Sequence, residues 1–143
     1  GLKMVIDGTT LAGDAIQSLR ARLERGDVAT GAGHYRVHDV GGAYLDRIAH
    51  DVKLARPMRI AVDCGNGVAG AFAPTLFRRL GCDLVELYCD VDGRFPNHHP
   101  DPSQPKNLAD LSERLARGDC EIGLAFDGDG DRLGDGTMDG HMI

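Results

Sequence analysis

The sequence contains no tryptophan, and only three tyrosines and four phenylalanines occur among its 143 residues. So few aromatic rings give little support to a surface that stacks on nucleic-acid bases or on sugars. Basic runs are missing as well, because none is longer than the pair Arg78-Arg79, and the formal net charge is −6. These features argue against a nucleic-acid partner.

Long apolar segments are also absent from the sequence. No stretch approaches the roughly 20 apolar residues that a membrane-spanning helix needs, and the N-terminus has no signal-peptide pattern. The cysteines include no Cys-x-x-Cys pair, and each lies in or beside an apolar segment: Cys64, Cys82, Cys89 and Cys120. Buried free thiols in a reducing compartment explain them better than zinc ligands or disulfides. We therefore predict a cytoplasmic protein with no membrane partner.

What the sequence does contain is the composition of a globular protein, with 42% apolar and 27% charged residues. From residue 57 onward, apolar runs alternate with amphipathic segments. This pattern predicts strands at residues 58–62, 83–88 and 121–126 and helices at residues 71–80 and 108–115. Strands and helices that alternate with short connections form a parallel sheet covered by helices. The predicted fold class is α/β, a three-layer α/β/α arrangement with a mainly parallel sheet.

The remaining segments carry weaker signals. Residues 2–6 read as a short strand, and Thr10 is a plausible N-cap for a helix whose apolar positions recur from residue 11 to residue 23. A glycine-rich connection follows, and a second amphipathic helix is predicted at residues 43–53. Residues 137–143 are predicted to begin another strand.

The most informative segment for function is Asp127-Gly128-Asp129-Gly130-Asp131-Arg132, which directly follows the predicted strand 121–126. In an extended segment, alternate side chains point the same way, so the three carboxylates could share one side. Such close carboxylates repel one another unless a cation lies between them. Hard oxygen ligands without His or Cys favour Mg²⁺, Mn²⁺ or Ca²⁺ over zinc. The arginine suggests that a phosphate group joins the metal.

Two other interpretations of this acidic segment are weaker. An EF-hand calcium loop needs Gly at position six and Glu at position twelve, where this sequence has Arg132 and Met138. A solvated turn would explain one Asp-Gly pair. It does not explain three aspartates in register followed by an arginine. A third possibility stays open, in which the segment holds only a structural cation.

Gly65-Asn66-Gly67-Val68-Ala69-Gly70 is a second candidate site, because it fits Gly-x-Gly-x-x-Gly between a predicted strand and helix. That context is typical of a dinucleotide-binding turn, and Asp90 lies 20 residues after Gly70, roughly where a ribose-binding acid would stand. A dinucleotide-binding domain of an oxidoreductase is therefore an alternative function. A tight turn that needs glycine for packing explains the same pattern and is the preferred interpretation.

Four segments, in order along the chain, carry a resemblance to one enzyme family: Gly1-Leu-Lys-Met-Val5, Val62-Asp-Cys-Gly-Asn-Gly-Val-Ala-Gly70, Phe95-Pro-Asn-His-His-Pro-Asp-Pro102 and Asp127-Gly-Asp-Gly-Asp-Arg132. The sequence resembles the α-D-phosphohexomutases, specifically their bacterial phosphomannomutase/phosphoglucomutase branch. Enzymes of this family interconvert hexose 1-phosphates and hexose 6-phosphates through a phosphoserine.

The resemblance implies roles for five residues. Asp127, Asp129 and Asp131 would bind Mg²⁺ together with the phosphoserine oxygen. Arg132 would contact the transferring phosphoryl group or orient the metal loop, and Lys3 would do acid/base or electrostatic work. A phosphorylated hexose would be the substrate.

The resemblance also implies a division of the chain. Residues 1–40 would be the C-terminal remnant of phosphohexomutase domain 1, and residues 41–143 would be domain 2. The family's serine loop, of Ser-His-Asn-Pro type, would lie just before Gly1, so we expect the chain alone to be inactive.

The adjacent pair His98-His99 could serve acid/base catalysis or metal binding. Because Pro96, Asn97 and Pro100 flank the pair, the interpretation that we favour is a structural one. The histidines would fix a rigid loop through hydrogen bonds.

Overall fold

The structure is a computed structural model that describes residues 3–141. The chain divides into two compact units, Gly1–His38 and Asp39–Ile143.

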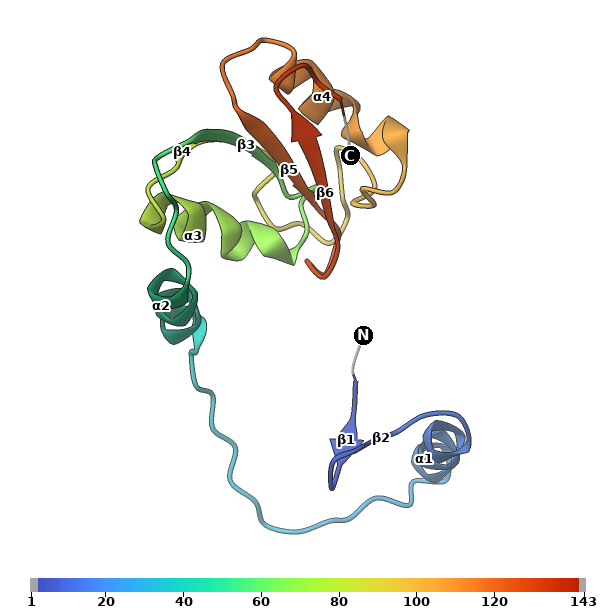
Figure 1. The fold of residues 1–143 in the computed structure, drawn as a ribbon. Helices are drawn as coiled ribbons and strands as arrows, with labels where there is room; N and C mark the ends of the chain where they lie inside the picture. Colours follow the sequence, from blue (N-terminus) through green and yellow to red (C-terminus); the bar gives the residue numbers. More distant parts are fainter. Residues whose placement is uncertain (1–2, 142–143) are drawn as a thin grey trace. The chain divides into compact units, whose positions relative to one another are not determined.

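The first unit contains an antiparallel hairpin and one helix (Figure 1). Strand β1 (Val5–Ile6) pairs with β2 (Thr9–Thr10). The two turn residues Asp7 and Gly8 have positive φ angles of 48° and 75°, as tight Asp-Gly hairpin turns require. Helix α1 (Asp14–Glu24) follows.

Two predictions for this unit need correction. Thr10 is not the N-cap of the helix, because it pairs with Val5 in the hairpin and Gly13 takes the cap position. The predicted strand 2–6 is present only as Val5–Ile6, while Leu2 lies outside the described residues. The second hairpin strand was missed because two threonines between turn signals give no apolar alternation.

The second unit is built around a four-stranded sheet with the order β4-β3-β5-β6 (Figure 1). Its strands are β3 (Arg59–Asp63), β4 (Asp83–Leu87), β5 (Ile122–Phe126) and β6 (Leu133–Thr137). Strand β3 pairs in parallel with both β4 and β5, whereas β6 runs antiparallel to β5. The helices are α2 (Gly41–Asp51), α3 (Ala73–Arg79) and α4 (Ala109–Leu115), with 3₁₀ turns η1 (Val68–Ala71) and η2 (Pro105–Leu108).

Two apolar clusters cover the two faces of this sheet. Ile60 and Val62 of β3 pack with Ala73 of α3 on one face. Ala61, which points to the other face, packs with Leu111 and Leu115 of α4. This alternation follows from the two-residue period of a strand. The α/β class with a mostly parallel sheet between helices is thereby confirmed.

The last strand was predicted in the wrong place. Strand β6 begins at Leu133, directly after the acidic segment, and ends at Thr137, where the prediction had it begin. Residues 142 and 143 of the predicted strand lie outside the described residues. Asp135 and Gly136 did not look like strand residues, but an edge strand needs a partner on one side only and tolerates them. Gly136 is buried opposite Gly123 of β5.

No helix within residues 3–141 is both long and apolar enough to cross a membrane.

Candidate metal centre

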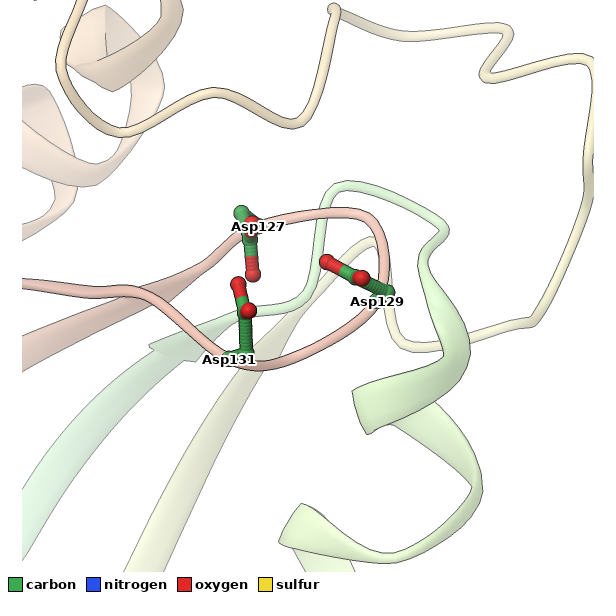
Figure 2. A group of neighbouring side chains, drawn as sticks. All are labelled: Asp127, Asp129 and Asp131. Carbon is green, nitrogen blue, oxygen red and sulfur yellow. The ribbon is translucent and has the colours of Figure 1, made fainter. Parts of the chain in front are cut away.

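The acidic segment forms the tight connection between the antiparallel strands β5 and β6 (Figure 2). It starts at the carboxyl end of β5, a parallel strand, which is where ligands gather in open α/β sheets. Each of Asp127, Asp129 and Asp131 offers one carboxylate oxygen, and these three oxygens lie within 4.8 Å of one another. The alternation in the sequence predicted this grouping.

The donor set fits a hard divalent cation. Magnesium and calcium bind oxygen ligands at about 2.0–2.6 Å, so two ligands of one ion lie at most about 5 Å apart. Asp127 is 1% exposed, whereas Asp129 and Asp131 are exposed. One carboxylate is thus fixed in the protein interior, and the other two face solvent, from which a cation could reach the group.

Arg132 closes the acidic segment onto its first residue. Its backbone N–H donates to Oδ1 of Asp127 at 3.0 Å, and its Nε donates to Oδ2 at 2.8 Å. Burial raises the pKa of Asp127, but these hydrogen bonds and the arginine charge outweigh it, so the net pKa is lowered. Asp127 is therefore held as a carboxylate at neutral pH. The guanidinium also lies 3.5 Å from Asp101 and 3.9 Å from Asp131.

Two backbone hydrogen bonds hold the acidic segment from either side. The N–H of Gly128 donates to the carbonyl of Pro100 at 3.1 Å. The carbonyl of Gly128 accepts a hydrogen bond from the N–H of Val68 at 3.1 Å. Gly130 has a φ of +74°, which a glycine adopts without strain. The loop at residues 95–102 and the glycine-rich turn at residues 65–70 thus fix the position of the carboxylates.

The glycine-rich turn is explained by packing. A Cβ at Gly67 would lie 2.9 Å from the carbonyl oxygen of Gly128, and one at Gly70 would lie 2.0 Å from that of Cys89. Gly65 has a φ of +49° and would meet Pro100 at 2.8 Å. Each glycine of the Gly-x-Gly-x-x-Gly pattern therefore allows a close approach, Gly65 to the loop at residues 95–102 and Gly67 to the acidic segment itself. This supports the packing interpretation over dinucleotide binding.

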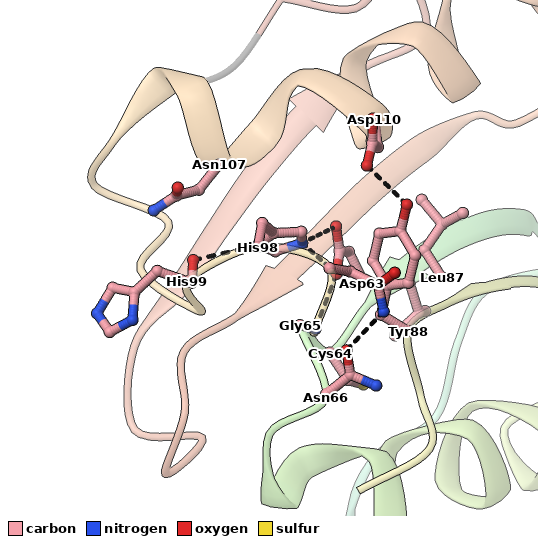
Figure 3. Close-up of polar contacts among 12 residues, drawn as sticks. Asp63, Cys64, Gly65, Asn66, Leu87, Tyr88, His98, His99, Asn107 and Asp110 are labelled. Atoms are coloured by element: carbon pink, nitrogen blue, oxygen red, sulfur yellow. Dashed lines mark hydrogen bonds and ion pairs between the residues drawn. The ribbon is translucent and has the colours of Figure 1, made fainter. Parts of the chain in front are cut away.

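A contact between a histidine and a buried aspartate supports the loop at residues 95–102 (Figure 3). Asp63, 1% exposed at the end of β3, lies 3.2 and 3.1 Å from Nε2 of His98 through its two carboxylate oxygens. Nδ1 of the same ring lies 3.1 Å from the carbonyl of His99. Both ring nitrogens thus lie within hydrogen-bonding distance of oxygen atoms. Burial raises the pKa of Asp63, and hydrogen bonds from Gly65 and His98 partly offset this.

The structural interpretation of His98 is therefore confirmed, since its ring ties two segments together. The His98 ring also packs edge-on against Tyr88, with centroids 5.4 Å apart. The Tyr88 hydroxyl donates to Asp110 of α4 at 2.6 Å, which raises the pKa of Tyr88 to about 12. The neighbouring His99 is exposed and contacts the ring of Phe95.

Sequence reasoning missed two supporting aspartates. Asp63 closes a buried strand, and a polar residue at the carboxyl end of a parallel strand was a usable signal. Asp101 lies beside Arg132 and accepts hydrogen bonds from Ser103, which lower the pKa of Asp101. Nothing in the sequence linked Asp101 to an arginine 31 positions away. Lys3, the other predicted catalytic residue, is exposed in the first unit.

Comparison with known proteins identifies the family. The profile described as "Phosphoglucomutase/phosphomannomutase, alpha/beta/alpha domain II" matches residues 42–139. The chain belongs to the phosphoglucomutase/phosphomannomutase family. The resemblance seen in the sequence is thereby confirmed.

Named relatives agree with this assignment. The chain is 57% identical over 145 residues to the phosphoglucomutase of Neisseria meningitidis, covering 100% of the chain and 32% of that protein. It is 50% identical over 143 residues to the phosphomannomutase/phosphoglucomutase of Pseudomonas aeruginosa, covering 100% of the chain and 31% of that protein.

A crystal structure of a phosphoglucomutase/phosphomannomutase family protein from Burkholderia thailandensis matches with a TM-score of 0.91 and 54% identity, covering 99% of this chain and 31% of that one. The chain thus spans about a third of the length of the relatives that it matches.

Proposed function

We propose that the chain supplies the metal-binding part of a phosphohexomutase active site. The enzyme would interconvert hexose 1-phosphate and hexose 6-phosphate, of mannose or glucose, through a phosphoserine. The observation that carries this proposal is the grouping of three carboxylates beside Arg132 at the carboxyl end of a parallel strand. Membership of the family and the printed names of the relatives support the substrate class.

Asp127, Asp129 and Asp131 would hold Mg²⁺. When bound, the ion would neutralise phosphate charge and polarise the transferring phosphoryl group. Asp127 is the fixed ligand, because Arg132 holds it from the backbone and from the side chain. Asp129 and Asp131 stand at the exposed end of the connection, where a phosphate oxygen of the serine could bind the same ion as a further ligand.

Arg132 would have a second role toward the substrate. Its Nε is engaged by Asp127, but the side chain is 61% exposed. Its outer nitrogens could therefore reach a phosphoryl group, whose oxygens a guanidinium matches in geometry and charge. Lys3 would act as an acid/base or electrostatic residue, a role that rests on the family resemblance.

The assignment of residues 1–40 to the end of domain 1 and of residues 41–143 to domain 2 is part of the proposal. The profile match over residues 42–139 supports the second half of it. The division of the chain into Gly1–His38 and Asp39–Ile143 supports the position of the boundary. A cytoplasmic location also remains a prediction.

The 143-residue chain is proposed to be inactive by itself. None of its three serines is followed by His-Asn-Pro. The test is a coupled assay for glucose 6-phosphate formed from glucose 1-phosphate in the presence of Mg²⁺. We expect no turnover by the chain and Mg²⁺-dependent turnover by the complete protein.

In the complete protein, Asp129→Asn should reduce kcat by at least a hundredfold. Asp135→Asn in strand β6 is the matched control and should keep activity. Turnover by the 143-residue chain would overturn the proposed division of the active site, and full activity of Asp129→Asn would overturn the metal assignment.

A further inference from the structure

Two cysteines of the second unit lie in direct contact. Cys64 follows β3, and Cys89 lies two residues after the end of β4, the parallel neighbour of β3. Their Sγ atoms are 3.5 Å apart. A disulfide needs about 2.05 Å, so the two sulfurs would have to approach by roughly 1.5 Å. The proposed phosphohexomutase function uses neither thiol.

The two thiols differ in their surroundings. Cys64 is 0% exposed, and its pKa is raised by the hydrogen bond with Cys89 and by burial. Cys89 is only half-buried, and its thiol donates to Cys64 Sγ at 3.5 Å and lies 3.7 Å and 3.5 Å from the carbonyl oxygens of Val62 and Leu87. An oxidant must reach the reacting sulfur, so the more accessible Cys89 is the nucleophile of the pair and the buried Cys64 is the resolving thiol.

We propose that Cys64 and Cys89 are an oxidisable dithiol, which hydrogen peroxide converts into a disulfide. The Cys89 thiolate attacks one peroxide oxygen, the O–O bond breaks, and hydroxide leaves with the electron pair. The resulting sulfenic acid carries the oxidised sulfur. Cys64 then attacks that sulfur, the S–S bond forms, and the sulfenic hydroxyl leaves as water with the thiol proton. One peroxide is reduced for two thiols oxidised, and two water molecules result once the hydroxide is protonated.

The disulfide would act on the turn behind the acidic segment. Cys64 is where the turn begins, and the carbonyl of Cys89 touches Gly70, where the turn ends. Between them, Asn66 donates its side-chain amide to the carbonyl of Asp90 at 2.8 Å, and Val68 donates to Gly128. A disulfide between Cys64 and Cys89 would therefore link this turn covalently to the segment that follows β4. It also restricts the unfolded chain across the 25 residues that separate the two cysteines.

To test this proposal, the complete protein is treated with hydrogen peroxide and its remaining thiols are blocked by alkylation. The peptides are then mapped by mass spectrometry. We expect a peptide pair linked through Cys64 and Cys89, lighter by two hydrogen atoms and restored by dithiothreitol. The oxidised protein should melt at a higher temperature than the reduced protein. This measurement needs no variant and does not depend on the mutase activity.

Variants separate the two thiols. In Cys64→Ser, Cys89 should accumulate as a sulfenic acid that dimedone traps, whereas Cys89→Ser should abolish both products. Cys82→Ser and Cys120→Ser are matched controls at buried cysteines and should leave the Cys64–Cys89 link intact. Alkylation of both Cys64 and Cys89 after peroxide treatment, or a link that involves Cys82 or Cys120 in their place, would overturn the proposal.

Discussion

The His98 imidazole lies against both carboxylate oxygens of Asp63 and joins two segments that are 35 residues apart in the sequence (Figure 3). Asp63 ends strand β3, and His98 belongs to the loop whose Pro100 carbonyl accepts the N–H of Gly128. The acidic segment is thus hydrogen-bonded to a loop that the contact between His98 and the buried Asp63 anchors to the sheet. The positions of the three proposed metal ligands therefore depend on a contact outside the carboxylate group.

Removing the imidazole should destabilise the fold and loosen the acidic segment. His98→Ala leaves the buried Asp63 with only the backbone N–H of Gly65 as a hydrogen-bond donor, which should cost about 1 to 3 kcal/mol of unfolding free energy in urea titrations of the 143-residue chain. The affinity of the complete protein for Mn²⁺ should fall as well. His98→Gln, which keeps an amide donor, should recover part of both losses.

The neighbouring histidine provides the matched control for this prediction. His99→Ala removes an exposed ring but keeps the backbone carbonyl that faces the His98 ring. It should change stability by less than about 0.5 kcal/mol. Equal losses for His98→Ala and His99→Ala would show that the Asp63 contact does not matter.

Arg132→Lys tests whether the arginine orients Asp127, the buried member of the three proposed metal ligands. Lysine keeps the charge but lacks the Nε donor that holds Oδ2 of Asp127. Residues that orient a metal ligand typically contribute 10- to 100-fold to metal affinity, so we expect roughly a tenfold weaker Mn²⁺ affinity by electron paramagnetic resonance. Arg117→Lys, at an exposed arginine near Glu113, is the control. Unchanged affinity of Arg132→Lys would remove the orienting role.

Gly70→Ala distinguishes a packing role of the glycine-rich turn from a nucleotide-binding role. The added methyl group would lie 2.0 Å from the Cys89 carbonyl oxygen, and we expect a loss of about 3 kcal/mol in unfolding free energy. Gly93→Ala, whose Cβ would meet nothing within 4 Å, should be close to neutral. Fluorescence or calorimetric titration with NAD or FAD should show no binding at millimolar concentration. Saturable binding that Gly67→Val abolishes would restore the dinucleotide hypothesis.

The ion pair between Arg114 and Asp119 should make the stability of the fold depend on pH in the acid range. The hydrogen bond from Arg114 lowers the pKa of Asp119 to about 2. Because the folded pKa lies below the unfolded value of about 3.9, the stabilisation is present above pH 4 and disappears as the pH falls toward 2. In urea titrations at several pH values, Asp119→Asn should be less stable than the unchanged chain at pH 6, and the difference should shrink by pH 2. A difference that does not vary with pH would contradict the assignment.

The sequence predicted those parts of the fold that have a strong local signal. The apolar runs at residues 58–62, 83–88 and 121–126 identified the three parallel strands, because buried parallel strands consist of continuous apolar residues. Strand β6 was misplaced because its pattern, with Gly134, Asp135 and Gly136, reflects an edge position that only the folded sheet reveals. The hairpin strand at Thr9–Thr10 was not predicted, because a strand of two residues is too short to show a periodic pattern.

The candidate site, like the fold, could be predicted from the sequence only in part. The alternation of Asp127, Asp129 and Asp131 lies within five residues and predicted the carboxylate grouping directly. The contacts that hold the three carboxylates in place could not be predicted from the sequence, because they join residues far apart along the chain. Val68 to Gly128 and Asp63 to His98 are contacts of this kind.

The most direct test of the proposed function is the position of the metal in the complete protein. Crystals of the phosphorylated enzyme grown with Mn²⁺ would locate the ion by its anomalous signal. We expect one ion bound by Asp127, Asp129 and Asp131 and by an oxygen of a phosphoserine from outside these 143 residues. An ion bound elsewhere, or one held by the three aspartates but far from any phosphoserine, would contradict the proposed function.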